Sequence, residues 1–411
     1  MSRYINKFST VNDLQNALNN GDLSKPYVGY VVSTESVDFN TLSPVTPVIS
    51  GPLKLVFGTV TSEDPQETPI LYANEGDFEY SIDNGETWED LGDSTNPLEV
   101  QEGDEVLLRG DNHRYTGSHN TAIQVENIEF EVEGNIMSCY DSTGYTTVTE
   151  FQEGETYVFQ NYFYHNTGLT SAENLILPVT TLVQGCYEGM FEGCSNLTTG
   201  PATLPATTMA ESCYQSMFNE CSSLETAPAL PATTLADSCY AMMFAVCESL
   251  TTAPALPATN LENMCYYNML AECGSLTTAP VLSATTMAES CYAEMFVACT
   301  GLTTAPALPA TTLAENCYEG MFGDCTFLTT APELPATVLV DGCYMGMFSN
   351  CQNLEEVKCN ATDISAPECV EGWLDGASET GTLYKNPEME DWVEGDNIPS
   401  GWTIEDWVEN E

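Results

Sequence analysis

The hydrophobic and polar positions in the second half of this chain repeat every 26 residues. From about residue 175 to residue 354 the unit reads approximately LxTAPxLPATTLxxxCYxxMFxxCxx. Repeats of this length predict a solenoid, in which each unit buries its hydrophobic side against its neighbours. The clearest marker is a pair of cysteines eight residues apart, which recurs seven times: Cys186/Cys194, Cys213/Cys221, Cys239/Cys247, Cys265/Cys273, Cys291/Cys299, Cys317/Cys325 and Cys343/Cys351.

The segment CYxxMFxxC of each unit has the spacing of an amphipathic helix. In the unit that begins at Cys317, a helix would place Met321 and Cys325 on the same face as Cys317. Tyr318 and Phe322 would lie beside them, and the positions that differ between units would face solvent. The sequence therefore predicts one helix per unit.

Threonines upstream of the cysteines indicate where these helices would begin. A Thr followed three residues later by Glu or Gln has the spacing of a capping box. Asn260 and Val338 take this position in two units, and because Val cannot cap, we expect the helix end at Val338 to fray. The threonines at this position are Thr181, Thr208, Thr286 and Thr312, with Thr234 and its following Asp237 as a near match.

A short strand is expected between consecutive helices, in the segment LTTAPxLP. Proline has no amide hydrogen, so a parallel ladder over residues 302–309 must end by Pro306. A short strand and a helix in 26 residues fit the 20 to 29 residues of leucine-rich repeats. We therefore predict an α+β multidomain chain in which residues 136–357 form an α/β leucine-rich-repeat solenoid of about seven units.

The seventeen cysteines are expected to be free and buried, as small fillers of the core. Residues eight apart on a helix are about 12 Å apart and packed helices about 8 to 10 Å apart, whereas a disulfide needs Cα atoms within about 7 Å. Zinc is the alternative, but the sequence has no CxxC, and its three histidines precede the array. Three cysteines lie outside the repeat register and have no assigned role: Cys139, Cys359 and Cys369.

The charge of the chain restricts its partners. The formal net charge is −53, and none of the eight basic residues lies between Arg114 and Lys358. A surface without cations cannot neutralise phosphates, so nucleic acid and anionic membranes are disfavoured. We interpret the acidic residues as a solubilising surface, with uptake of Ca²⁺ as the alternative, although no EF-hand spacing occurs.

No catalytic constellation is evident in the sequence. Ser/His/Asp, Cys/His and paired-carboxylate arrangements at diagnostic spacing are missing. No stretch approaches the roughly 18 apolar residues that a membrane-spanning helix needs. We therefore expect a non-enzymatic protein without a cofactor, a metal centre or membrane insertion.

Residues 46–135 are predicted to form a small β-sandwich of immunoglobulin-like type. Segments rich in β-branched and aromatic residues occur at 53–57, 78–82, 105–108 and 128–132, separated by turn sequences. Short strands at this spacing are typical of a sandwich.

The two ends of the chain differ from the parts between them. Residues 1–45 contain an amphipathic pattern at 11–20, a predicted strand at 27–32 and no apolar signal-peptide region. Residues 358–411, which hold four of the five tryptophans, are predicted to cap the solenoid. We interpret residues 1–45 as a docking or oligomerisation segment with apolar contacts from Tyr4, Phe8, Leu14, Leu18, Tyr27 and Tyr30.

Paired threonines give the candidate binding surface of the array. Adjacent residues on a strand point to opposite faces, so only one of each pair would join a single ladder, which argues against an ice-binding surface. Nearly identical units would offer weak, repeated contacts, and binding would rest on avidity. The pairs are Thr251 and Thr252, Thr277 and Thr278, Thr303 and Thr304, and Thr329 and Thr330.

Two resemblances cover most of the chain. The unit TTAPALPATTLAENCYEGMFGDC, the lead-in over residues 134–175 and the ending that starts CNATDISAPECVEGW resemble BspA-type leucine-rich-repeat proteins of gut anaerobes and their terminal cap. The opening RYINKFSTVNDLQNALNNGDLSKPYVGYVV resembles the N-terminal segment of structural proteins in bacteriophages and prophages of the same bacteria, including crAss-like phages.

The resemblances imply two functional hypotheses. BspA-type proteins imply adhesion to host protein or glycan, usually by exported proteins of the bacterial surface, whereas this chain shows no export signal. A virion protein needs none, because it assembles in the host cytoplasm. We therefore expect a virion component, such as a capsid decoration, head fibre or tail appendage. Its N-terminal segment would contact other virion proteins or further copies of the chain, and its solenoid would face host-surface or mucus glycan or protein. The alternative is a bacterial cell-surface adhesin.

Overall fold

The computed structural model divides the chain into two compact units, Met1–Val48 and Ile49–Glu411. It describes residues 51–62, 64, 66–74, 76–112, 122–395 and 397–407, together with the backbone of two short strands near the N-terminus. These strands, β1 (Lys7–Phe8) and β2 (Tyr30–Val31), pair in parallel. β2 falls inside the strand predicted at 27–32, and the helix predicted at 11–20 lies outside the described residues.

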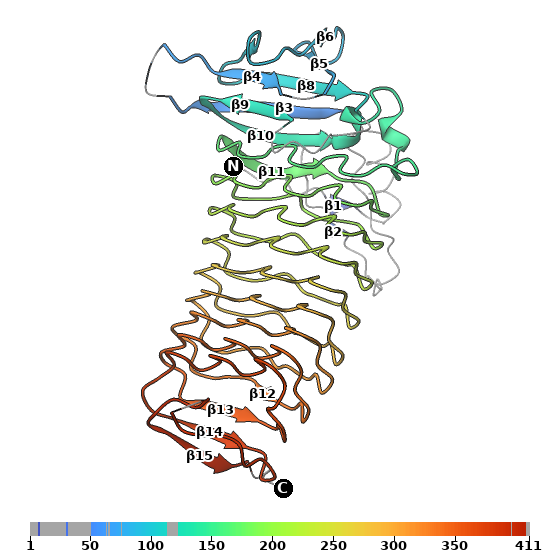
Figure 1. The fold of residues 1–411 in the computed structure, drawn as a ribbon. Coiled ribbons are helices and arrows are strands. Elements are labelled where there is room, and N and C mark those ends of the chain that lie inside the picture. Colours follow the sequence, from blue (N-terminus) through green and yellow to red (C-terminus); the bar gives the residue numbers. More distant parts are fainter. Residues whose placement is uncertain are drawn as a thin grey trace. The chain divides into compact units, whose positions relative to one another are not determined.

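The unit Ile49–Glu411 begins with two sheets, drawn in blue to green in Figure 1. The strands predicted at 53–57, 78–82, 105–108 and 128–132 are confirmed as β3, β5, β8 and β10. One sheet has the order β11-β10-β3-β8-β5-β6, from β3 (Leu53–Val60), β5 (Phe78–Ser81), β6 (Glu89–Asp90), β8 (Glu105–Gly110), β10 (Ile128–Asn135) and β11 (Leu169–Ile176). The other has the order β7-β4-β9, from β4 (Ile70–Ala73), β7 (Leu98–Glu99) and β9 (Ile123–Glu126).

Side chains from both sheets pack into one hydrophobic core. In β3, buried Leu53, Leu55 and Phe57 alternate with half-buried residues, as the period of two in a strand requires. β11 joins the sheets to the repeats, because it pairs in parallel with β10 and bridges from Ser171 to Thr199. The core therefore continues without a break from the sheets into the repeats.

The prediction of one helix per repeat is wrong. The helices in the described part of the chain are two short 3₁₀ turns, η2 (Ile136–Cys139) and η3 (Tyr145–Thr147), which both precede the cysteine pairs. The repeats instead form coils that stack on one another, seen as successive levels in Figure 1. The architecture is thus a solenoid of mostly β and turn structure, without the α component that the sequence predicts.

Each CYxxMFxxC segment is a chain of tight turns with a period of four residues. Its amides alternate between two acceptors: the Met321 amide donates to Tyr318 of the same coil at 3.2 Å, and the Tyr318 amide donates to Cys343 of the next coil at 3.2 Å. Every fourth residue has a left-handed backbone, with φ of 54° at Asn316, 56° at Gly320 and 58° at Asp324. We call the stacked segments of this kind the turn ribbon.

The period of four explains why the helix prediction fails. Over nine residues, a repeat of four turns the same residues inward as a helix with 3.6 residues per turn. The two structures differ in their hydrogen bonds, because the ribbon sends alternate amides to the next coil. The spacing of hydrophobic residues is the same in both structures and therefore does not distinguish them.

The predicted cap residues also have another role. They lie in isolated parallel bridges between neighbouring coils and do not cap helices. The predicted fraying of a helix end at Val338 is therefore wrong. The bridges join Thr181 to Thr208, Thr208 to Thr234, Asn260 to Thr286, Thr286 to Thr312, and Val338 to Asp363.

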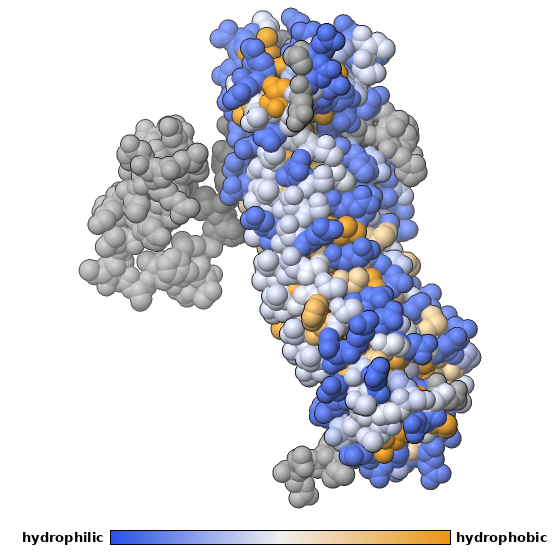
Figure 2. Space-filling model, turned by 90° about the vertical axis from the view of Figure 1, so that its left-hand side faces the viewer, coloured by the Kyte–Doolittle hydropathy of each residue, from blue (hydrophilic) through white to orange (hydrophobic). Residues whose placement is uncertain are grey.

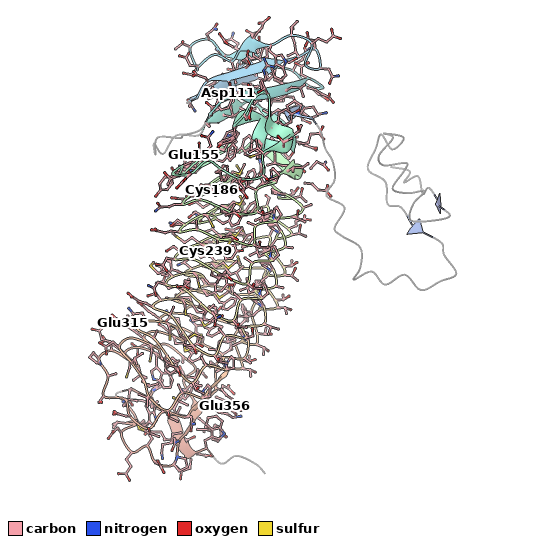
Figure 3. The ribbon with its side chains drawn as sticks, turned by 90° about the vertical axis from the view of Figure 1, so that its right-hand side faces the viewer. Asp111, Glu155, Cys186, Cys239, Glu315 and Glu356 are labelled. Atoms are coloured by element: carbon pink, nitrogen blue, oxygen red, sulfur yellow. The ribbon has the colours of Figure 1, made fainter. Side chains whose placement is uncertain are left out.

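Aromatic ladders run through the stack. Tyr240 and Tyr266 are stacked with ring centroids 5.9 Å apart, and Phe322 and Phe348 with centroids 5.7 Å apart. In Figure 3, Cys186 and Cys239 mark two levels of the stack, and Glu315 lies at its edge. The tyrosine ladder continues through seven coils: Tyr187, Tyr214, Tyr240, Tyr266, Tyr292, Tyr318 and Tyr344.

The stack has more coils than cysteine pairs. Residues 157–165 precede the first pair and donate alternate amides to it, for example from Phe159 to Cys186. Residues 368–376 follow the last pair, and Tyr344 donates to Cys369. Cys369 therefore occupies the first-cysteine position of a further coil, so its placement outside the repeat register is wrong.

The C-terminal end of the stack holds a parallel four-stranded sheet, drawn in orange to red in Figure 1. Its strands are β12 (Glu333–Leu334), β13 (Glu356–Cys359), β14 (Gly381–Lys385) and β15 (Trp402–Asp406). Cys359 pairs with Leu334, so it fills a leucine position of the repeat. All seventeen cysteines are free and buried, which confirms that prediction.

Candidate binding surface

The eight threonines of the predicted surface are all exposed. The second Thr of each pair lies in a bridge between coils, from Thr252 to Thr278 and from Thr304 to Thr330. Coils joined in this way repeat at the spacing of parallel strands, about 4.8 Å. The threonines therefore form an exposed row along the stack.

Some of these hydroxyl groups are used within the stack. The Thr329 hydroxyl donates to the Thr303 carbonyl at 3.1 Å, and the Thr198 hydroxyl donates to the Thr170 carbonyl at 3.0 Å. Each such bond fixes the side chain of one coil to the backbone of the preceding coil. The surface is thereby preorganised, since its side chains are held by the same contacts that stack the coils.

The threonine row belongs to a wider uncharged surface. Five consecutive coils have a stretch without Asp, Glu, Lys, Arg or His, at 198–208, 226–234, 251–260, 277–286 and 303–312. The second stretch begins one residue later in its unit, because the exposed Glu225 takes the place of the first Thr. We call these five segments the neutral face. Its exposed residues are Thr, Ala and Pro, together with Asn260 and Ser283, and Val281 at 80% exposure is its largest apolar side chain. Figure 2 shows pale residues of intermediate hydropathy along the stack, as expected for such a composition.

The turn ribbon carries acidic groups instead. Glu294 accepts hydrogen bonds from the Asn268 side chain at 2.6 Å and from the Tyr267 hydroxyl at 3.1 Å. Partial burial, and then the nearby charges of Glu294 and Glu368, raise the pKa of Glu319. Like charges on neighbouring coils thus repel one another on this side of the stack.

Every basic side chain in the described part of the chain pairs with an acid. Lys54 contacts Glu133 at 2.5 Å, and Arg109 contacts Glu79 at 2.7 Å. Lys358 contacts Glu333 at 3.2 Å, and Lys385 contacts Asp406 at 2.7 Å. The described surface therefore offers acidic groups and the neutral face to a partner.

Sequence reasoning found the threonines but missed the extent of the neutral face. The signal was present in the absence of any charged residue from five consecutive segments of a chain with net charge −53. The predicted docking residues Tyr4, Leu14, Leu18 and Tyr27 lie outside the described residues. Phe8 and Tyr30 are described only as backbone, in β1 and β2.

In the described ranges, no three His, Cys, Asp or Glu side chains gather as metal ligands. No helix within those ranges has the length and apolar character needed to cross a bilayer. Comparisons of the chain with protein-family models, with curated proteins and with solved structures give no match.

Proposed function

We propose that this chain is a non-enzymatic structural protein of a bacteriophage particle, in the position of a capsid decoration, head fibre or tail appendage. Its solenoid presents the neutral face as an adhesive or protective surface. Residues 1–45 attach the chain to other virion proteins or to further copies of itself. The observation that carries the adhesive part is the neutral face on an otherwise strongly acidic chain.

The neutral face suits a partner that is itself uncharged or acidic. Acidic side chains repel anionic mucus and cell-surface polymers, whereas Thr, Ala and Pro do not. Threonine hydroxyls both donate and accept hydrogen bonds, as sugar hydroxyls do. Identical contacts repeated at about 4.8 Å along the stack would give many weak interactions with an extended polymer, so that affinity rests on their number.

We assign the solenoid to the leucine-rich-repeat class, in a form without helices. Leu250, Leu256 and Leu261 of one unit are all buried, which gives the unit the leucine positions of that class. Strand pairing between its coils and a resemblance to BspA-type proteins support the assignment. We likewise assign the two sheets of residues 46–135 to an immunoglobulin-like sandwich.

The adhesive role is tested by placing charge on the neutral face. The double variant Thr278→Glu/Thr304→Glu should lose most binding to a glycan array and to purified mucus glycoprotein, because charge and bulk interrupt the repeated contacts. Ser249→Glu/Ser275→Glu adds the same charge at exposed positions outside the neutral face and should bind normally. Equal binding by both variants would exclude the neutral face as the adhesive surface.

The proposed location of the protein in the virion is tested separately. Mass spectrometry of purified particles should detect it at a fixed ratio to the major capsid protein. A bacterial adhesin is the alternative, favoured by the BspA resemblance. Surface-shaved peptides from uninfected cells, with none in purified particles, would establish that alternative and end the virion proposal.

A further inference from the structure

The last coil of the stack opens onto a pocket of about 470 Å³. This volume lies within the range of about 300 to 1,000 Å³ that is usual for ligand sites. The floor is the coil at 368–376, and the opposite wall is formed by Gly395 and residues 397–400. The pocket is distinct from the neutral face, and the inference drawn from it does not depend on the proposed function.

The inner coils show how the backbone amides of the turn ribbon are paired when a further coil follows. In the preceding coil, the amides of Tyr344, Gly346 and Phe348 donate forward to carbonyls of the last coil at 2.8 to 3.0 Å. Gly342 and Asn350 donate in the same direction. Each inner coil therefore presents five forward amides, and the next coil supplies five carbonyl acceptors.

The corresponding amides of the last coil have no hydrogen-bond acceptor among the described residues. The alternate amides of this coil, such as that of Trp373, still make the internal turn bonds, so the ribbon geometry is intact. A left-handed backbone persists as well, with φ of 53° at Glu368, 60° at Gly372 and 70° at Gly376. The five forward amides belong to residues that all line the pocket: Glu368, Val370, Gly372, Leu374 and Gly376.

The wall of the pocket is held in place. The Trp373 indole donates to the Asn397 carbonyl at 2.7 Å, which ties the floor to the wall. Asn397 also accepts a bond from the Val393 amide at 3.0 Å through its side chain. Because these contacts fix both sides, the pocket is preformed and a ligand need not order it.

The charges around the pocket decide which kind of acceptor it takes. Concave groups of amides commonly bind anions. Here, however, Glu368, Glu371 and Asp375 are exposed on the floor segment itself, and the described residues that line the pocket include no cation to offset them. A phosphate, sulfate or carboxylate would meet that repulsion, whereas peptide carbonyls are neutral acceptors.

We propose that this pocket binds an extended peptide segment of neutral or basic character. The peptide takes the place of a further coil: its carbonyls accept from the five forward amides, in the manner of a strand added to a sheet edge. Its Lys or Arg side chains pair with the acidic groups of the floor. Ile364 and Ala366, which line the pocket and are half-buried, supply the apolar contacts.

A second copy of the chain stacked end to end does not fit. The other end of the stack is occupied, because the sheets cover the coil at 157–165 and the Ile123 amide donates to the Tyr162 carbonyl at 3.2 Å. An inner coil of another copy would also bring its own acidic residues against those of the last coil. The occupant is therefore a separate peptide segment.

Binding is tested with the full chain and an array of random decapeptides sorted by net charge, with inorganic phosphate and sulfate as anion probes. Hydrogen exchange provides the second measurement. Without peptide, the forward amides at 368–376 should exchange faster than those of Tyr344, Gly346 and Phe348. Neutral or basic peptides should bind and slow exchange at 368–376. Binding of phosphate or sulfate at these amides, binding of peptides elsewhere, or no binding would each overturn the proposal.

Two variants locate the site. Ser400→Trp fills the mouth of the pocket and should weaken peptide binding by about tenfold or more, whereas Ser275→Trp, at an exposed position of an inner coil, should not. Glu371→Lys/Asp375→Lys should shift the preference toward acidic peptides, and Glu315→Lys should not. Unchanged exchange protection at Tyr344 and Phe348 would show that each variant is folded. Equal binding by the two tryptophan variants would exclude this pocket.

Discussion

The Sγ atom of Cys351 lies 3.1 Å from the carbonyl oxygen of Phe322 in the preceding coil. The same oxygen accepts the Cys325 amide at 3.1 Å, so the thiol completes its hydrogen bonding. The second cysteine of all seven pairs makes this contact, at 3.0 to 3.2 Å. The first cysteine of the same pair differs, because Cys343 Sγ lies 3.9 Å from the Cys369 carbonyl.

This difference predicts unequal effects of serine at the two positions. Cys351→Ser keeps a donor within reach of Phe322, whereas Cys343→Ser buries a hydroxyl whose carbonyl neighbour lies too far away for a hydrogen bond. We expect Cys343→Ser to lower the free energy of unfolding by about 1 to 2 kcal/mol more than Cys351→Ser. Urea denaturation of the two variants measures the difference. Equal losses would show that the second thiol acts only as an apolar filler.

The buried thiols predict a stability that falls in alkaline solution. Burial raises the pKa of Cys273 and of Cys325 to about 12. In the unfolded chain thiols ionise near their ordinary pKa of about 8.5, so above that pH the unfolded state binds fewer protons than the native state. The stabilisation is complete below about pH 8.5 and is lost as the pH rises toward 12, at about 1.4 kcal/mol per pH unit for each thiol.

Urea midpoints measured from pH 7 to pH 10.5 check this trend, and the midpoint should drop steeply above pH 9. A thiol reagent at pH 8 gives an independent control. It should label almost no cysteine in the native chain and all seventeen after denaturation. Rapid labelling of the native protein would contradict the burial on which the pH dependence rests.

The sequence predicted the stack because its period and its buried face depend on local spacing. The short strand predicted in each unit is reduced in most coils to an isolated bridge, such as that from Thr304 to Thr330, although β12 is a strand. It could not predict the turn ribbon, because Cys317, Met321 and Cys325 face inward in both a helix and a chain of four-residue turns. The deciding property is the destination of alternate amides, such as that of Tyr318, which lies in the next coil. Glycine was a local hint at Gly185, Gly189 and Gly193, where all three left-handed positions of one coil carry it.

The threonine surface and the pocket also differ in how far the sequence could predict them. Exposure of the paired threonines follows from the repeat and could be predicted. The pocket could not, since its five amides belong to residues of unremarkable type such as Leu374, and their lack of acceptors follows from being in the last coil. Cys369 escaped notice because its coil has Val370 and Ala377 where other coils have Tyr and Cys.

The left-handed positions predict that glycine is tolerated at Val246. Its φ is 60°, a conformation that costs a residue with a Cβ atom about 1 to 2 kcal/mol and is least suited to a β-branched side chain. Val246→Gly should change the free energy of unfolding by less than about 1 kcal/mol, because relief of the left-handed conformation offsets the lost contacts of a half-buried side chain and the flexibility of glycine in the unfolded chain.

Val297 is the matched control for that substitution. It is half-buried like Val246 but lies outside the left-handed region, one position before Ala298. Val297→Gly should therefore destabilise the chain by about 1 to 2 kcal/mol. Urea denaturation compares the two variants, and a loss of similar size at both positions would show that backbone conformation does not set the cost.

The tyrosine ladder predicts a stabilising change at Tyr214. Its ring stacks on those of Tyr187 and Tyr240, while its hydroxyl is buried with no hydrogen-bond partner in the described structure. Tyr214→Phe keeps the stacking and removes the unsatisfied group, so the free energy of unfolding should rise by about 1 kcal/mol. Tyr140→Phe is the control, because the Tyr140 hydroxyl donates to Glu155 at 2.7 Å and its loss should destabilise the chain by a similar amount. Thermal denaturation of both variants should shift the midpoints in opposite directions, and a lower midpoint for Tyr214→Phe would mean that its hydroxyl has a partner in solution.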